Sequence, residues 1–239
     1  MIVGSERVRG VLFDKDGTLL DFHKTWGKLG EQVILTLSAG EPRLARRLAE
    51  VAGFDMTTMS YAPGSPIVAG AIDEIVAGWL PLLDQWERAE LEEWLNIQAT
   101  SVRGDALQAA SRDIKGLMRR LRSAGLVLGV ATHDGEAPAK LHLTDLDVIE
   151  SFDFIAGYDS GYGSKPGPGM LQGFSAKTGV RAETTIVVGD SLHDLGMAKS
   201  GGALAGIGVL TGPARRSDLE AHADLVIASI DDLPTVLGI

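Results

Sequence analysis

The sequence contains no cysteine. Disulfide bonds and thiolate metal sites are therefore excluded, and cysteine usage gives no indication of the redox compartment. Basic residues are also few, since 22 Lys and Arg stand against 32 Asp and Glu and the formal net charge is −10. A chain with this charge repels a polyphosphate backbone and offers no basic stripe, which argues against nucleic acid as a partner. Any anionic ligand must be held by a local group of residues.

Long apolar runs are missing as well. Residues 1–10 include charged side chains and lack the apolar core of a signal peptide. No stretch approaches the roughly 18 apolar residues of a membrane span. We therefore expect a cytoplasmic protein without a membrane partner. With 239 residues, of which 45% are hydrophobic, the chain can bury a core in one large domain or two smaller ones.

Short apolar runs alternate with helical patterns in the C-terminal half of the chain and at its start. Continuous Val, Ile and Leu runs separated by helices are typical of buried parallel strands in an α/β fold. A helix is expected over residues 107–121, where apolar residues recur at helical spacing, and Pro138 and Pro168 mark possible helix starts. The predicted strands cover residues 7–13, 126–131, 152–156, 185–188, 204–209 and 225–228.

Residues 22–103 have no comparable strand. Apolar residues recur there at helical spacing from Leu29 to Leu95, and the sequence Ala-Pro-Gly-Ser-Pro at residues 62–66 predicts a loop. We predict an α-helical domain at residues 22–103, inserted into an α/β core formed by residues 1–21 and 104–239. The chain is expected to pass between the two parts near residues 20–24 and 101–105.

Polar residues directly follow several of the predicted strands. The residues in these positions are Asp14, Asp16, Thr132, His133, Asp190 and Asp194, and Lys165 lies in the loop beyond residues 152–156. Ligand sites of open α/β sheets lie at the carboxyl ends of the strands, so we expect these side chains to converge. Four converging carboxylates repel one another unless a cation lies among them. Oxygen ligands of this kind favour Mg²⁺.

Several motifs of this sequence occur in the same order as in a known protein family. The set consists of "DKDGTL" from residue 14, Thr132, Lys165 and "GDSLHD" from residue 189. It resembles the haloacid dehalogenase superfamily, in particular its phosphoglycolate phosphatase-like members with a helical C1-type cap. The resemblance covers the whole chain, with residues 22–103 in the place of the cap. It implies a Rossmann-like parallel sheet core and a Mg²⁺-dependent phosphatase, monomeric or homodimeric, that hydrolyses a small-molecule phosphate monoester, with phosphoglycolate as one candidate.

The resemblance also implies catalytic roles. Asp14 would be the nucleophile that forms an aspartyl-phosphate, which divides one difficult displacement into two easier ones. Asp16 would protonate the leaving alcohol and later accept a proton from water. Lys165 would neutralise charge on Asp14 and on the phosphoryl oxygens, and the Thr132 hydroxyl would hold those oxygens. Asp16 also favours phosphoester chemistry over the dehalogenation, phosphonate cleavage and ion pumping found among relatives that usually lack it.

A metal site and a substrate contact follow from the same resemblance. Mg²⁺ would be held by the Asp14 carboxylate, the Asp16 backbone carbonyl and the Asp190 carboxylate, with Asp194 adjoining through water or as a supporting partner. Thr132, His133 and Lys165 would bind the substrate. His133 departs from the Asn that the family often carries, so it could contact substrate or only pack at the edge of the site.

Several alternatives stay open. Asp14 or Asp16 could be turn residues, and Asp190 a helix cap, Thr132 a strand-end residue, Lys165 a solvated lysine and Asp194 a helix-surface acid. Lys15 is expected to face away from both neighbouring aspartates, as a supporting or surface residue. His23, Lys24, Arg43 and residues 61–66 of the insert could contact the leaving group or be solvated. A sugar phosphomutase of the β-phosphoglucomutase type and a non-catalytic binding protein remain alternative functions.

Overall fold

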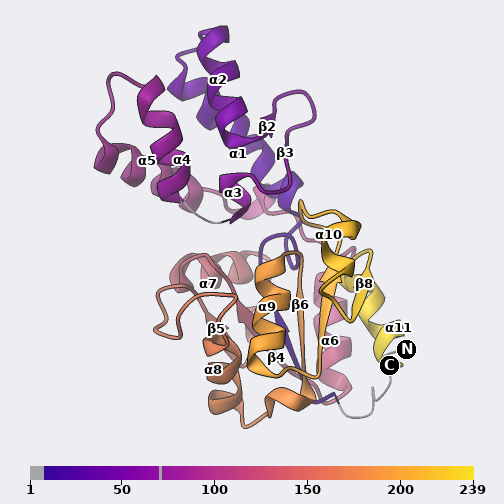
Figure 1. Ribbon diagram of the computed structural model, residues 1–239. Coiled ribbons are helices and arrows are strands. Elements are labelled where there is room, and N and C mark those ends of the chain that lie inside the picture. Colours follow the sequence, from indigo (N-terminus) through magenta and orange to yellow (C-terminus); the bar gives the residue numbers. More distant parts are fainter. Residues whose placement is uncertain (1–7, 70–71) are drawn as a thin grey trace. The chain divides into compact units, whose positions relative to one another are not determined.

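The chain divides into two compact units (Figure 1). The computed structural model describes residues 8–69 and 72–239. One unit extends to Phe22 and resumes with Leu107–Ile239, and the other is His23–Ala106. The sequence places the corresponding boundaries after residues 21 and 103. None of the helices in the described part of the chain is long and apolar enough to cross a membrane.

A six-stranded sheet forms the centre of the first unit. Its strand order is β5-β4-β1-β6-β7-β8, and every neighbouring pair is parallel. This confirms the parallel α/β fold predicted from the apolar runs. The strands are β1 (Gly10–Phe13), β4 (Val127–Ala131), β5 (Phe154–Ala156), β6 (Thr185–Gly189), β7 (Ala205–Val209) and β8 (Leu225–Ile227). The predicted start of the first strand, Arg7, lies outside the described residues.

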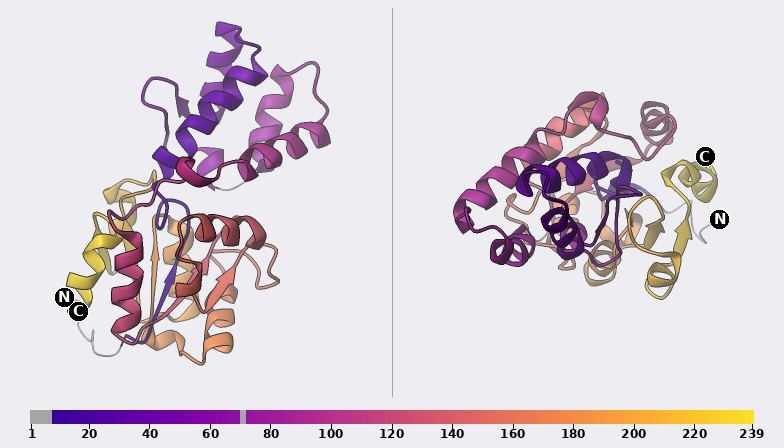
Figure 2. Two further views of the ribbon diagram at one scale, coloured as in Figure 1. Left: turned by 180° about the vertical axis from the view of Figure 1, so that it is seen from behind. Right: turned by 90° about the horizontal axis from the view of Figure 1, so that it is seen from above.

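Helices cover both faces of this sheet. Val11 and Phe13 of β1 pack in one apolar cluster with residues of α6, α7 and α11, whereas Leu12 packs in a second cluster with α8 and α9. The views in Figures 1 and 2 show these two layers from opposite sides. Both faces of each strand are apolar because both are covered, as is usual for parallel sheets. The helices of this unit are α6 (Ile114–Ser123), α7 (Glu136–Asp145), α8 (Gly169–Thr178), α9 (Leu192–Gly201), α10 (Arg216–Glu220) and α11 (Leu233–Leu237).

The helix predicted from residue 107 begins at Ile114 instead. In the preceding segment, Ala109 forms an antiparallel bridge with Leu20, and the N–H of Ala110 donates to the carbonyl of Leu19 at 2.9 Å. The Asp113 carboxylate then caps α6 by accepting the N–H of Gly116 at 2.9 Å. The apolar spacing before residue 114 therefore reflects packing of an extended return segment rather than a helix. The two marked prolines do lie at helix starts, with Pro138 in the first turn of α7 and Pro168 as the N-cap of α8.

The second unit is helical and contains a short ribbon that the sequence pattern did not reveal. Strand β2 (Phe54–Asp55) pairs antiparallel with β3 (Ser60–Tyr61). Two residues per strand are too few for apolar alternation to be visible. Helix α1 (Phe22–Leu37) approaches this ribbon closely, since a Cβ on Gly30 would lie 2.2 Å from the Tyr61 hydroxyl. The other helices are α2 (Pro42–Ala52), α3 (Pro66–Ala69), α4 (Ile72–Trp79) and α5 (Arg88–Thr100).

The loop predicted at residues 62–66 ends one residue earlier, because Pro66 already opens α3.

Short 3-10 helices complete both units. The 3-10 helices are η2 (Leu80–Leu82), η3 (Gly104–Ala106), η4 (Ile149–Ser151), η5 (Ala182–Thr184) and η6 (Ile230–Asp232).

Candidate active site

The sheet register brings the ends of three strands together. Phe13 of β1 pairs with Val130 of β4 on one side and with Val188 of β6 on the other. Asp14 directly follows Phe13, while Thr132 and Asp190 each lie two residues beyond the partners of Phe13. The strand order also reverses at β1, and such switch points are where open α/β sheets bind ligands. The topology therefore explains why residues far apart in the sequence meet here.

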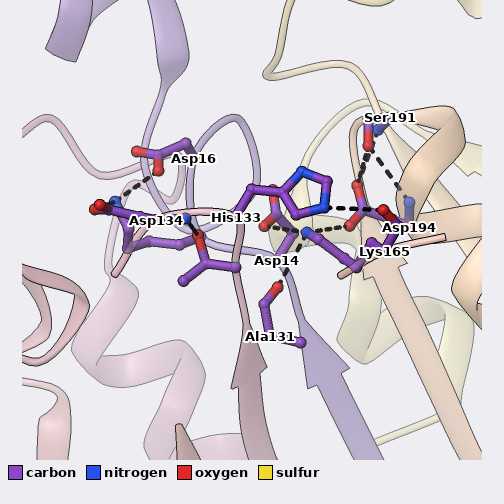
Figure 3. Close-up of polar contacts among 10 residues, drawn as sticks. Asp14, Asp16, Ala131, His133, Asp134, Lys165, Ser191 and Asp194 are labelled. Carbon is purple, nitrogen blue, oxygen red and sulfur yellow. Dashed lines mark hydrogen bonds and ion pairs between the residues drawn. The ribbon is translucent and has the colours of Figure 1, made fainter. Parts of the chain in front are cut away.

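Lys165 joins two buried carboxylates (Figure 3). Its Nζ lies 2.7 Å from Asp14 Oδ1, 2.6 Å from Asp194 Oδ1 and 3.1 Å from the carbonyl oxygen of Ala131. These three acceptors match the three protons of an ammonium group. Burial by itself would lower the pKa of Lys165, but the charges of Asp14 and Asp194 raise it above its ordinary value. Lys165 is thus a buried cation of the site and not a solvated loop lysine.

Three carboxylates form a compact acidic group around this lysine. Oxygens of Asp14, Asp190 and Asp194 all lie within 4.8 Å of one another. Burial raises the pKa of Asp14 to about 7, an effect that Lys165 opposes and Asp194 reinforces. Burial, followed by the charges of Asp14 and Asp194, also raises the pKa of Asp190. With all three carboxylates ionised and Lys165 protonated, the group carries two negative charges. A divalent cation would balance these charges and so favour the ionised forms, and all-oxygen donors fit Mg²⁺.

Two glycines make room for the Asp190 carboxylate. A Cβ on Gly212 would lie 1.8 Å from Asp190 Oδ2, and a Cβ on Gly17 would lie 2.5 Å from the carboxyl carbon. Gly17 also has φ +81°, a left-handed conformation that favours glycine. The Thr211 hydroxyl donates to the Gly17 carbonyl at 2.6 Å and ties the two loops together. Gly212 was not identified as a site residue from the sequence, although it follows an apolar run in the same way as the aspartates.

Asp194 is a buried support for this arrangement. Its Oδ2 accepts the N–H of Ser191 at 3.1 Å and the Ser191 hydroxyl at 2.6 Å, while its Oδ1 accepts from Lys165. Ser191 therefore caps α9 in a capping box with Asp194, and Asp190 is not the cap. The helix-surface alternative for Asp194 is wrong, because its side chain is 0% exposed. The pattern Ser-x-x-Asp before a helix is the sequence signal that could have identified Ser191.

Lys15 contradicts the predictions that its side chain faces away from both aspartates or lies at the surface. Its Nζ lies 2.6 Å from Asp16 Oδ2, 3.2 Å from Asp134 Oδ2 and 3.1 Å from His142 Nδ1, and the side chain is fully buried. The expected alternation fails because β1 ends at Phe13 and the chain turns at once, with three following N–H groups donating to the Lys15 carbonyl. Asp134 follows Thr132 and His133 directly after the predicted strand, but no role was assigned to it from the sequence. His142 was missed, and no short motif marks it.

Asp16 and Asp134 lie together in Figure 3, apart from Lys165 and Asp194. The predicted catalytic aspartates thus have separate cationic partners, since Asp14 is bonded to Lys165 and Asp16 to Lys15. The two carboxylates therefore have different surroundings, as an acid–base group and a nucleophile require.

Thr132 and His133 lie at the end of β4. The buried Thr132 hydroxyl accepts the N–H of Asp134 at 3.0 Å, so its own proton can be donated elsewhere. His133 Nε2 lies 3.1 Å from the carbonyl of Lys165, and a carbonyl only accepts, so Nε2 carries the ring proton. Burial lowers the pKa of His133 to about 4, which leaves the imidazole neutral near pH 7. Its ring packs on His193 with the centroids 5.3 Å apart, a neighbour that the sequence did not indicate.

The candidate leaving-group contacts of the helical unit stay predictions. His23 and Tyr61 come together within that unit, where the N–H of Tyr61 donates to His23 Nδ1 at 3.3 Å. Arg43 lies in the first turn of α2, where its N–H donates to the Glu41 carboxylate at 3.1 Å.

Comparisons with known proteins show the family and the fold of this chain. The family model of haloacid dehalogenase-like hydrolases matches residues 8–202. The phosphoglycolate phosphatase of Escherichia coli (strain K12) is 27% identical, over 98% of this chain and 94% of its own length. "Probable phosphatase IndB" of Dickeya dadantii (strain 3937) is 30% identical, over 95% and 91%.

A solved structure shows the same fold. It is that of a predicted phosphoglycolate phosphatase from Haemophilus somnus 129pt, which superposes with a TM-score of 0.73 at 15% identity, over 96% of this chain and 98% of the other. Because the family model spans most of the sequence and the sheet and sequence relatives agree with it, this chain belongs to the haloacid dehalogenase-like hydrolases and is an enzyme of the phosphatase type.

Proposed function

We propose that this phosphatase hydrolyses a small-molecule phosphate monoester through an aspartyl-phosphate on Asp14, with Mg²⁺ as its cofactor. The main support for this proposal is the buried Asp14 carboxylate, which lies at the switch point of the sheet, is bonded to Lys165 and is close to Asp190. A carboxylate at this place has the surroundings of a nucleophile, since a cation offsets its charge and a strand end fixes its position.

The reaction would proceed in two displacements. An Asp14 oxygen attacks phosphorus, the bond from phosphorus to the alcohol oxygen breaks, and Asp16 gives its proton to the departing alcohol. Water then attacks the phosphoryl group and gives a proton to Asp16, which releases inorganic phosphate and restores Asp14. The Thr132 hydroxyl donates to a phosphoryl oxygen, and Lys165 offsets the charge on the oxygens as it spreads.

The cofactor would be held by the carboxylates of Asp14 and Asp190 and by the backbone carbonyl of Asp16. Asp194, whose two oxygens already accept from Lys165 and Ser191, would support this group. When bound, Mg²⁺ supplies the positive charge that lets an anionic carboxylate approach an anionic phosphoryl group.

The substrate proposal rests on the relatives. Phosphoglycolate is the first candidate, because the 27% identical relative is named a phosphoglycolate phosphatase. We further propose that residues 23–106 act as the cap that selects the leaving group, while the sheet unit carries out phosphoryl transfer.

The test uses the full chain with 4-nitrophenyl phosphate and phosphoglycolate, in Mg²⁺ and in chelator. We expect sustained release of inorganic phosphate that needs Mg²⁺, and a phosphorylated protein after rapid acid quenching. Asp14→Asn should lose both signals and keep its fold, whereas Asp147→Asn, a change at an exposed aspartate, should keep both. Normal turnover in Asp14→Asn would overturn the mechanism. Weak turnover that rises only with an added sugar phosphate would favour the phosphomutase.

A further inference from the structure

A second buried ammonium serves the second aspartate of the reaction. Lys15 has three acceptors, Asp16 Oδ2, Asp134 Oδ2 and His142 Nδ1, at 2.6, 3.2 and 3.1 Å. This arrangement repeats that of Lys165, which also has three acceptors and also holds a catalytic carboxylate. The two lysines lie in different segments of the chain, and what they share is the set of hydrogen-bond acceptors around the ammonium rather than a sequence motif.

The position of the Lys15 ammonium is fixed from several directions. Asp16 lies in the turn after β1, Asp134 in the loop after β4, and His142 on the buried face of α7. An ammonium only donates, so His142 Nδ1 must accept and its proton must be on Nε2. Asp134 is held in turn, because its own N–H donates to the Thr132 hydroxyl and its Oδ1 accepts the N–H of Gly135 at 2.8 Å.

Stability does not explain a lysine at this position. Burying an ammonium completely has a large desolvation cost, and buried ion pairs can often be replaced by apolar residues of similar volume without loss of stability. That replacement would have to include the acceptors, because removing Lys15 alone leaves the buried His142 Nδ1 and two carboxylates without their ammonium. The side chain of Asp16, by contrast, is 21% exposed, against 10% for Asp14. The Asp16 carboxylate reaches solvent while its Oδ2 is bonded to a fully buried ammonium, so this contact restricts the orientation of the carboxylate.

We propose that Lys15 is a positioning residue of the phosphatase reaction, which holds the Asp16 carboxylate in the orientation needed at the leaving-group oxygen while Asp134 and His142 fix the ammonium. The proposal rests on the proposed acid–base function of Asp16. Proton transfer requires the acid to lie within hydrogen-bond reach of the leaving oxygen. If the Asp16 carboxylate is loosely held, it spends less time in that position, and the rate of proton transfer falls although the residue is still there.

The experiment measures how Lys15→Met changes the dependence of turnover on the leaving group, with Mg²⁺ present. Alkyl phosphates need protonation of the leaving oxygen, whereas 4-nitrophenyl phosphate needs it little. We expect kcat for the alkyl phosphates to fall about 100-fold, the lower end of the usual effect of a general acid, with little change for the aryl phosphate. KM should change little, because Lys15 does not contact the substrate.

A double-variant cycle separates positioning from general damage. Asp16→Ala is expected to lose the same leaving-group-dependent activity, and adding Lys15→Met to it should cause no further loss. A kcat that falls equally for all leaving groups, or a double variant well below Asp16→Ala, would overturn the proposal. Lys115→Met removes an exposed ammonium bonded to Asp147 and should resemble the wild type throughout.

A second variant covers the case in which Lys15→Met does not fold. Asp134→Asn keeps the size of a side chain that is 30% exposed and removes one acceptor charge from the ammonium. It should show the same selective loss for alkyl phosphates, to a smaller extent, and wild-type selectivity in it would also overturn the proposal. Failure of the proposed function looks different: the wild type would lack phosphatase turnover, or Asp16→Ala would lack leaving-group dependence.

Discussion

Replacing Asp14 with Asn is expected to make the metal-free protein more stable at pH 8. Burial raises the pKa of Asp14 from its ordinary 3.8 to about 7. A carboxyl with a higher pKa in the folded chain than in the unfolded chain binds its proton more tightly when folded. The free energy of unfolding therefore falls as pH rises from about 4 to about 7, and it stays low above that range.

The size of this effect follows from the pKa values. A tenfold difference in proton affinity is worth about 1.4 kcal/mol, so the full change from 3.8 to about 7 corresponds to about 4 kcal/mol. About 3 kcal/mol of this falls between pH 5 and pH 8. Burial and the charge of Asp14 raise the pKa of Asp190 too, so removing the Asp14 charge also relieves its neighbour.

The assay is urea denaturation in chelator at pH 5 and pH 8. From pH 5 to pH 8, wild type should lose about 3 kcal/mol of stability relative to Asp14→Asn. Asp147→Asn is the matched control, since the hydrogen bond from Lys115 lowers the pKa of Asp147 and keeps it ionised at both values. Mg²⁺ at pH 8 should restore stability to the wild type but not to Asp14→Asn. The lowered pKa of His133 makes stability rise over the same pH range, but it acts in both proteins, so the comparison between them is the test. An equal change in stability from pH 5 to pH 8 in wild type and in Asp14→Asn would refute the reasoning.

Two further substitutions test the same site. Lys165→Met should lower the free energy of unfolding by about 3–5 kcal/mol, because it leaves the buried Asp14 and Asp194 without their shared cation. Adding Asp194→Asn to this variant should recover part of the loss, as measured by urea titration. Gly212→Ala should weaken Mg²⁺ activation about 10–100-fold, because the new methyl displaces the Asp190 carboxylate; unchanged Mg²⁺ dependence of turnover would show that the carboxylate does not hold the ion.

The strands and their order of appearance could be read from the sequence. Runs such as Ile186 to Val188 are apolar on both faces because helices cover both, and this pattern survives in a single sequence. Asp14, Thr132 and Asp190 were recognisable for a related reason, since each directly follows such a run.

The supporting residues were not recognisable in the same way. Lys15 was predicted to face away from its neighbours because an extended strand alternates its side chains, but β1 ends one residue before Asp14. His142 looks like any residue of α7 until that helix packs beside the turn after β1. Gly212 carries no signal of its close approach to Asp190, since that approach joins two loops far apart in the chain.

The sequence by itself determined the parallel α/β fold, the helical insert and the acidic motifs, because local apolar patterns and motif spacing record them. The resemblance already implied that Lys165 meets Asp14, but only the tertiary structure decided that Lys165 also meets Asp194 and that Lys15 meets Asp16 and Asp134. Those pairings join residues such as Lys15 and His142, which are 127 positions apart and come together only when β4 and α7 pack beside β1. The charge balance of the site is therefore a property of the folded sheet, because burial and distance set its energies and neither is present in the sequence.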